Sequence, residues 1–269
     1  MTTAIVNARM YSATPQLREH WKTLLAWVIR HAGLDWDLLD YDAPAPLSKL
    51  WSRDDLGAVL MCGLPFSRQY PRAQPVAAPI PSPARYGGRA VYFTDIVVSA
   101  GSAARSLADT FGGRVGYTVP DSLSGAVALA QHLQPYRQAA GRSLYQSVVG
   151  GLIHARGVIE ALSDGRIDVG PLDSYYHDLL RAADPQCASR VRVVAQTGPR
   201  PLPLFVATVP LSPVLLRRLR EAFAASADAP ELAQQRSALL LKGFAFPEPD
   251  DYDVLHALPE RLDNPDDAF

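Results

Sequence analysis

The stretch Leu56-Gly-Ala-Val-Leu-Met-Cys62 is an uninterrupted apolar run. A short run of this kind, without polar alternation, is typical of a strand covered on both faces, as in a parallel sheet between helices. Upstream of it, residues 3–9 predict a first strand and residues 36–41 a second extended segment. With a helix between these two segments and a short helix at residues 47–53, the order is strand, helix, strand, helix, strand.

The first of these helices has clear boundaries. Thr14 suits the N-cap position, Pro15 the first turn and Gly33 the end of the helix. One helical face collects the apolar side chains of Leu17, Trp21, Leu24, Leu25, Val28 and Ile29. We therefore expect this helix to pack that face against the sheet.

The rest of the chain repeats the alternation after a proline-rich interruption. Residues 65–88 favour a loop with a short extended segment at 75–80. Beyond an alternating strand at 91–98, helices are expected at 103–111, 124–133, 155–162 and 213–225, and strands at 114–118, 144–149, 167–172, 191–196 and 204–209. This pattern predicts an α/β fold with two lobes, each a mostly parallel sheet flanked by helices, and a ligand cleft between the lobes.

Composition narrows the functional classes. Twenty-six basic residues nearly balance 27 acidic ones, so the formal charge is -1 and a basic surface for nucleic acid is not expected. Cys62 and Cys187 lie far apart without neighbouring metal ligands, which predicts no metal site and leaves a disulfide between them open. Apolar runs stay well below the roughly 20 residues of a membrane span.

The amino-terminal sequence bears on localisation. It lacks a basic segment followed by an apolar stretch, the pattern of an export signal. Two alternatives stay open on this evidence: a cytoplasmic protein, or a periplasmic protein whose leader has been trimmed.

The strongest local motif is Asp121-Ser-Leu-Ser-Gly125, placed between a predicted strand and a predicted helix. A helix start carries unpaired N–H groups and a partial positive charge, so it can hold an anion, and serine hydroxyls add donors. The glutamate or glutamine of a capping box is absent three residues beyond Asp121 and Ser122. The alternative is that Ser122 or Asp121 is an ordinary helix cap.

Several motifs occur in an order that resembles the periplasmic phosphonate-binding family. These are Tyr11-Ser12, Gly63-Leu-Pro-Phe66, Tyr92 ahead of Ile96-Val-Val98, Pro120-Asp-Ser-Leu-Ser-Gly125, His154 with Gly165-Arg-Ile-Asp168, and Pro201-Leu-Pro203. That family comprises the substrate-binding components of phosphate and phosphonate ABC importers and has the type II periplasmic-binding-protein fold. The resemblance runs from about Tyr11 to Tyr252 and implies one lobe from residues 1–92 plus 205–269 and another from 93–204, with hinge crossings near 90–95 and 200–205.

The resemblance also implies which residues meet the ligand. It places the helix start of Ser122, Leu123, Ser124 and Gly125 at the ligand's anionic group, together with His154, and Asp173 at a cationic end. Leu123 stands where the family often has a further hydroxyl, which removes one donor. His154 and Asp173 can equally be helix caps or solvated side chains.

Aromatic side chains complete the predicted site. In the resembling family Tyr11, Phe66 and Tyr92 would wall the cleft, although an aromatic residue beside a strand is usually core packing. The segment Arg200-Pro-Leu-Pro203 offers no second carboxylate of the kind that the family sometimes has near the last hinge strand.

The predicted function is that of a solute-binding protein, without a cofactor, that closes on a small oxyanion such as a phosphonate or phosphate ester and delivers it to an ABC permease. Enzyme motifs are absent: there is no Gly-x-Ser-x-Gly elbow, Walker sequence, His-Glu-x-x-His or cysteine beside a base. The alternatives are an enzyme of small-molecule metabolism on the same fold, or a cytoplasmic ligand sensor.

Overall fold

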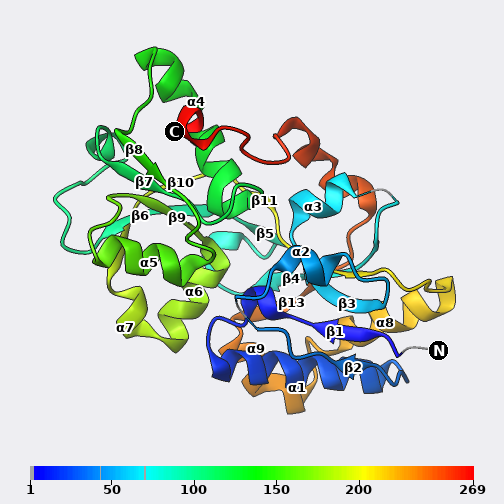
Figure 1. The fold of residues 1–269 in the computed structure, drawn as a ribbon. Helices are drawn as coiled ribbons and strands as arrows, with labels where there is room; N and C mark the ends of the chain where they lie inside the picture. The colour runs from blue at the N-terminus through cyan, green and yellow to red at the C-terminus, as the bar shows by residue number, and fades with distance from the viewer. Residues whose placement is uncertain (1–2, 43, 70) are drawn as a thin grey trace. The chain divides into compact units, whose positions relative to one another are not determined.

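The structure, a computed structural model, describes residues 3–42, 44–69 and 71–269, and divides the chain into two compact units (Figure 1). Unit 1 comprises the chain up to Val91 together with Pro201–Leu255, and unit 2 comprises Tyr92–Arg200 together with His256–Phe269.

The segment His256–Phe269 differs from the expected division, which placed it in the first lobe. It belongs to unit 2 because Phe269 is fully buried there and stacks on Tyr117, with 5.9 Å between the ring centroids. Leu262 N–H also donates to the Pro120 carbonyl at 2.9 Å.

Unit 1 contains one six-stranded sheet with its helices. Its strands are β1 (Ile5–Asn7), β2 (Asp37–Leu38), β3 (Leu56–Met61), β4 (Gln74–Pro81), β12 (Leu204–Ala207) and β13 (Leu241–Ala245). Its α-helices are α1 (Pro15–His31), α2 (Leu47–Trp51), α3 (Gly63–Arg68), α8 (Pro213–Ala225) and α9 (Ala233–Ala238). Short 3₁₀ turns occur at η1 (Arg9–Tyr11), η2 (Ala84–Tyr86) and η5 (Pro230–Leu232), and η6 (Pro249–Ala257) crosses into unit 2 at His256.

The sheet of unit 1 is mixed, which corrects the mostly parallel sheet expected from the sequence. Its order is β13-β4-β12-β3-β1-β2. Strand β1 is parallel to β2 and β3, as expected from the helices between them. Strand β12 is antiparallel to β3 and β4, and β13 is antiparallel to β4; β12 and β13 both come from the second half of the chain.

Helix α1 forms for the predicted reasons. Thr14 Oγ1 accepts a hydrogen bond from Leu17 N–H at 3.2 Å, Pro15 opens the first turn, and Gly33 follows the helix with a φ of 65°. The predicted apolar face is buried, and α1, α8 and α9 pack together along the sheet (Figure 1).

Unit 2 contains shorter sheets. Its strands are β6 (Thr94–Ser99), β7 (Arg114–Gly116), β8 (Ser147–Val149), β9 (Gly170–Asp173) and β10 (Val191–Gln196), while β5 (Val91–Tyr92) and β11 (Arg200–Pro201) lie where the chain passes between the units. Its helices are α4 (Ala128–Ala140), α5 (Ala155–Ser163), α6 (Ser174–Ala183), α7 (Pro185–Ala188) and α10 (Pro265–Ala268), with the 3₁₀ turn η3 (Ala108–Thr110) and the π-helical turn η4 (Leu123–Val127).

These sheets are also mixed. Strands β10, β6 and β9 pair antiparallel, whereas β7 and β8 are parallel and a parallel bridge joins Val115 to Val169 just before β9. Helices α5 and α6 pack on β6 and β9, and α4 contacts β6 (Figure 1).

Three expectations about local structure need correction. The helix expected at 103–111 is wrong, because the Asp109 carboxylate accepts hydrogen bonds from Arg105 N–H and Ser106 N–H at 2.7 and 2.8 Å and leaves only η3. The loop expected from residue 65 begins instead with the end of α3, whereas β4 confirms the extended segment expected at 75–80. The region after α8 contributes a strand, β13, that was not predicted.

Cys62 in unit 1 and Cys187 in unit 2, both among the described residues, form no disulfide. Within the described ranges, His, Cys, Asp and Glu side chains form no cluster suited to a metal ion. Helices in this part of the chain are too short or too polar to cross a bilayer.

Candidate ligand-binding site

Three loops of unit 2 leave their strands at the same edge. Parallel pairing of β7 with β8, and the parallel bridge from Val115 to Val169, align the carboxyl ends of β7, β8 and β9. Strand β6 runs antiparallel to β9, so Thr94 at its start lies opposite Asp173. The edge therefore receives the segments after β7, after β8 and after β9, where open α/β sheets commonly bind ligands.

The segment after β7 forms the predicted helix start. Ser122 is the N-cap, and its Oγ accepts a hydrogen bond from Gly125 N–H at 3.1 Å. The first turn is π-helical, with Val127 N–H donating to the Ser122 carbonyl at 3.0 Å. Because capping uses a lone pair of the Ser122 hydroxyl, its proton is still able to donate to a ligand.

Two threonines connect this helix start to its neighbours. Thr94 Oγ1 donates to the Ser124 carbonyl at 3.0 Å, which joins the helix start to β6. Thr118 N–H donates to the Gly125 carbonyl at 3.0 Å, and the Thr118 carbonyl accepts from Ile153 N–H at 3.4 Å. The segments after β7 and β8 thus meet at Thr118.

His154 lies at the start of α5, in the segment after β8. Its Nδ1 accepts a hydrogen bond from Gly157 N–H at 3.1 Å, which makes it the N-cap of that helix. Because an accepting Nδ1 carries no proton, the ring's proton is on Nε2, and the exposed ring can donate from there. Gly157 allows this turn because a Cβ there would collide with the Leu152 carbonyl.

The backbone immediately before His154 is strained. Ile153 has a φ of 64°, a left-handed conformation that is rare for a β-branched residue. Its side chain is half exposed. Strained residues of this kind concentrate at ligand sites, where the surrounding structure holds them in place.

Asp173 ends β9 and caps α6. Its Oδ1 accepts hydrogen bonds from Tyr175 N–H and Tyr176 N–H at 2.9 and 3.0 Å. Ser122, His154 and Asp173 therefore all act as helix caps, the alternative considered for each of them. In each side chain an acceptor atom takes part in capping. The contacts of these three residues with a ligand stay predictions.

A buried pair fixes α6 on the sheet behind Asp173. His177 Nδ1 lies 2.9 Å from Asp95 Oδ2, and both side chains are almost completely buried. Gln196 Nε2 donates to the other oxygen, Asp95 Oδ1, at 2.9 Å. This network ties β6, β10 and α6 together and so supports the position of Asp173.

The other predicted site residues are buried in the cores of their own units. Tyr11 and Phe66 in unit 1 and Tyr92 in unit 2 are each at most 2% exposed, and Leu123 is fully buried. Phe66 packs edge-on against Tyr252 at 5.1 Å between ring centroids. This burial matches the packing alternative for the aromatic residues, and their contact with a ligand stays a prediction.

Thr94 and Thr118 were missed by sequence reasoning. Thr118 stands two residues before the motif at Pro120–Gly125, at the end of a predicted strand, where a hydroxyl could have been noted. Thr94 gave no signal, because its link to Ser124 depends on the pairing of β6 and β9.

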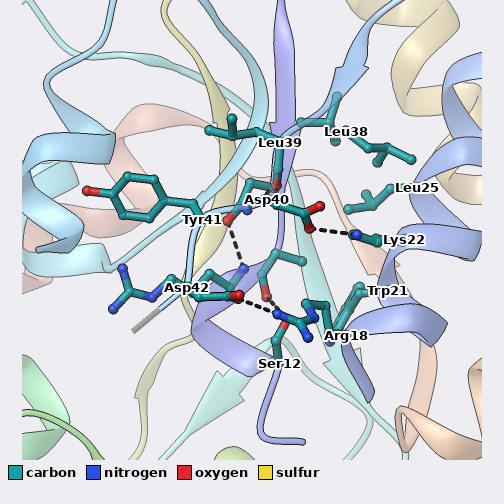
Figure 2. Close-up of a pocket in the computed structure, with 14 residues that line it drawn as sticks. Ser12, Arg18, Trp21, Lys22, Leu25, Leu38, Leu39, Asp40, Tyr41 and Asp42 are labelled. Atoms are coloured by element: carbon teal, nitrogen blue, oxygen red, sulfur yellow. Dashed lines mark hydrogen bonds and ion pairs between the residues drawn. The ribbon is translucent and has the colours of Figure 1, made fainter. Parts of the chain in front are cut away.

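A hollow in unit 1 offers a contrasting polar site (Figure 2). It lies between α1 and the carboxyl ends of β1 and β2, and its volume is about 20 Å³, room for about one water. Two of the three cations that line it have anionic partners: Arg18 Nη1 lies 2.5 Å from Asp42 Oδ1, and Lys22 Nζ 2.6 Å from Asp40 Oδ1. The third, Arg9, donates to the Ala45 carbonyl. The hydrogen bond to Lys22 lowers the pKa of Asp40, and that to Asp42 raises the pKa of Arg18.

A larger hollow of about 380 Å³ lies in unit 2 between α4 and the segment at 257–268. Charges of both signs line it, including Arg137, Arg261, Asp263 and Asp267. It is lined by none of the predicted site residues.

Comparisons with known proteins agree with this fold. The profile of a family described as "ABC transporter, phosphonate, periplasmic substrate-binding protein" matches residues 11–252. A search among curated proteins finds no match.

Several solved structures are similar to the chain. A binding-protein component of an ABC phosphonate transporter from Pseudomonas aeruginosa has a TM-score of 0.75 and 15% identity, covering 95% of this chain and 85% of the other. PhnD1 from Prochlorococcus marinus, in complex with methylphosphonate, has a TM-score of 0.76 and 14% identity, with coverage of 95% and 96%. An ATP-bound protein from Xanthomonas citri has a TM-score of 0.63 and 20% identity, with coverage of 96% and 95%.

Proposed function

Because the chain belongs to the family of periplasmic substrate-binding proteins of phosphonate ABC transporters, we propose that the edge of unit 2 around Ser122 binds the anionic group of a small oxyanion. The family is a substrate-binding component of a transporter, so the chain is a solute-binding protein rather than an enzyme. The ligand class we favour is a phosphonate, a phosphate ester or a similar anion.

One observation carries this proposal: the segments after β7, β8 and β9 converge on one edge and are joined there by Thr94 and Thr118. A helix start presents N–H groups and a partial positive charge to that edge, and Ser122 and Ser124 add hydroxyl protons. His154 adds the N–H at Nε2, the ring nitrogen that does not cap α5. These donors bind an anion without needing a metal.

Asp173 suggests what lies beyond the anionic group. A carboxylate near an anion site repels a second negative charge and attracts an amino group. Asp173 lies opposite Thr94, which bonds to the helix start, so it is close enough to face the organic part of a short ligand. We propose that a cationic substituent, where the ligand has one, lies toward Asp173.

Two similar structures support an anionic ligand. The Prochlorococcus marinus protein is in complex with methylphosphonate and the Xanthomonas citri protein with ATP, both of which present tetrahedral phosphorus oxyanions. We further propose that this chain works in the periplasm and delivers its ligand to the permease of an ABC transporter, as its family does.

A thermal-shift panel tests the ligand class. Methylphosphonate and inorganic phosphate should raise the melting temperature, because a ligand bound only to the native state at 100 times Kd stabilises it by about 2.7 kcal/mol. Choline and glycerol serve as cationic and neutral controls. A shift with choline or glycerol and none with either oxyanion would contradict the proposal.

A further inference from the structure

Thr118 has a buried hydroxyl that makes no hydrogen bond within the described residues. The residue is only 6% exposed, and its Oγ1 is shielded from solvent. A buried hydroxyl without a partner destabilises the native state, and such groups in folded proteins call for an explanation. Packing alone would be served equally well by valine, which has the same shape without the polar atom.

The position of this hydroxyl points to the helix start. Both main-chain groups of Thr118 are occupied, the N–H by the Gly125 carbonyl and the carbonyl by Ile153 N–H. Its Oγ1 lies directly against Gly125, where an added Cβ would collide with it and would lie 2.8 Å from Ser122 Oγ. The hydroxyls of Thr118 and Ser122 therefore flank the same face of Gly125, in the first turn of the helix.

The side chain between the two serines of this turn supplies no hydrogen-bond donor. Leu123, between the two serines, is fully buried, and its side chain has no hydrogen to donate. Resting on the proposed function, we infer that Thr118 Oγ1 is a third hydroxyl donor of the anion site and compensates for Leu123. Ser122, Ser124 and Thr118 then provide three hydroxyls, which suits an anion with three terminal oxygens better than a carboxylate with two.

Two substitutions separate this role from packing. Thr118→Val keeps the shape and removes the hydroxyl, whereas Thr118→Ser keeps the hydroxyl. Calorimetry with methylphosphonate should show that Thr118→Val binds about 10-fold more weakly than wild type, because it lacks one charge-assisted hydrogen bond. The affinity of Thr118→Ser should lie within about 3-fold of wild type. The preference for methylphosphonate over acetate should also fall in Thr118→Val.

The unliganded proteins provide a second readout. Because the hydroxyl has no partner before the ligand binds, Thr118→Val should melt at the wild-type temperature or above it. A lower melting temperature for Thr118→Val than for Thr118→Ser would overturn the inference, since it would mean that the hydroxyl stabilises the unliganded fold.

The outcomes distinguish this inference from the proposed function. Unchanged methylphosphonate affinity in Thr118→Val, with weakened binding in Ser122→Ala, would overturn the role of Thr118 and leave the proposed function standing. If the wild-type protein binds no oxyanion at all, the proposed function fails and the inference fails with it.

Discussion

The hollow of unit 1 and the edge of unit 2 both place polar groups at the carboxyl ends of strands, but they differ in how those groups are satisfied. In unit 1, Arg18 and Lys22 already have carboxylate partners, and the space between them admits about one water. In unit 2, Ser122 and His154 use acceptor atoms to cap helices and keep protons to donate. Hydrogen-bond donors that have no partner for their protons bind an anion more favourably than cations that are already in ion pairs.

The largest effect should come from Gly125→Ala. A Cβ at this position would collide with Thr118 Oγ1 and crowd Ser122 Oγ, so the helix start must shift. We expect a loss of stability of about 1–3 kcal/mol, as for other overpacked positions, and a loss of methylphosphonate affinity of at least about 10-fold. Denaturant unfolding and calorimetry measure the two quantities.

Gly101→Ala is the matched control for this substitution. Gly101 also belongs to unit 2, has an ordinary φ, and has no atom within 4 Å of an added Cβ. Gly101→Ala should leave both the stability and the methylphosphonate affinity unchanged. Wild-type affinity in Gly125→Ala would place the ligand elsewhere.

A pair of cap deletions separates capping from ligand binding. Ser122 and Ser212 both cap helices with Oγ, accepting from Gly125 N–H at 3.1 Å and from Leu215 N–H at 3.2 Å. Replacing either serine by alanine should cost about 0.5–2 kcal/mol of stability. Only Ser122→Ala should also weaken methylphosphonate binding, by about 10-fold.

Calorimetry and unfolding are measured on both variants. Equal methylphosphonate affinities in Ser122→Ala and Ser212→Ala would mean that Ser122 only caps its helix. The comparison is informative because both variants lose the same kind of hydrogen bond, but only one of them alters the proposed site.

His154→Asn tests the ring proton. Asparagine can still accept from Gly157 N–H as an N-cap, whereas the donor at Nε2 is lost. We expect stability within about 0.5 kcal/mol of wild type and affinity lower by about 5-fold, within the usual range for one hydrogen bond. His154→Ala, which loses both functions, should lose stability as well. Full affinity in both variants would remove His154 from the site.

The smallest effect is expected in unit 1. Asp40→Asn removes the partner of Lys22 from an exposed ion pair, so methylphosphonate affinity should be unchanged and stability nearly so. The pKa of Asp40 is lowered in the folded protein, so its contribution to stability is present above the ordinary aspartate pKa and is lost as pH falls through the lowered value. Unfolding of both proteins at pH 7 and pH 3 should therefore show a smaller difference in stability at pH 3 than at pH 7. A large gain in methylphosphonate affinity would instead assign anion binding to unit 1, because the substitution frees Lys22 from its carboxylate partner.

Local sequence signals predicted the parts of the structure that depend on local interactions. Helices α1 and α8 begin at Pro15 and Pro213 as expected, because a capping side chain and a proline define each start within a few residues. Strand β13 was missed because its place is set by pairing with β4, more than 150 residues earlier in the chain.

In the candidate site, too, some features follow from local sequence and others from long-range strand pairing. The hydroxyls of Ser122 and Ser124 could be read from one motif, since a helix start and its donors are neighbours in sequence. The convergence of Thr94, Thr118 and Ile153 on that motif depends on strand order and register, which no local pattern contains. Those contacts became visible only in the folded unit.

Amide NMR of the isotope-labelled protein during a titration with methylphosphonate tests the central claim most directly, because it reports where the anion binds. The helix start predicts the largest shifts at the amides of Ser124 and Gly125, with further shifts at Ile153 and His154. Amides beside Arg18 and Lys22 in the unit 1 hollow should move little. Saturable shifts around Arg18 and Lys22, with those of Ser124 and Gly125 unmoved, would contradict the account.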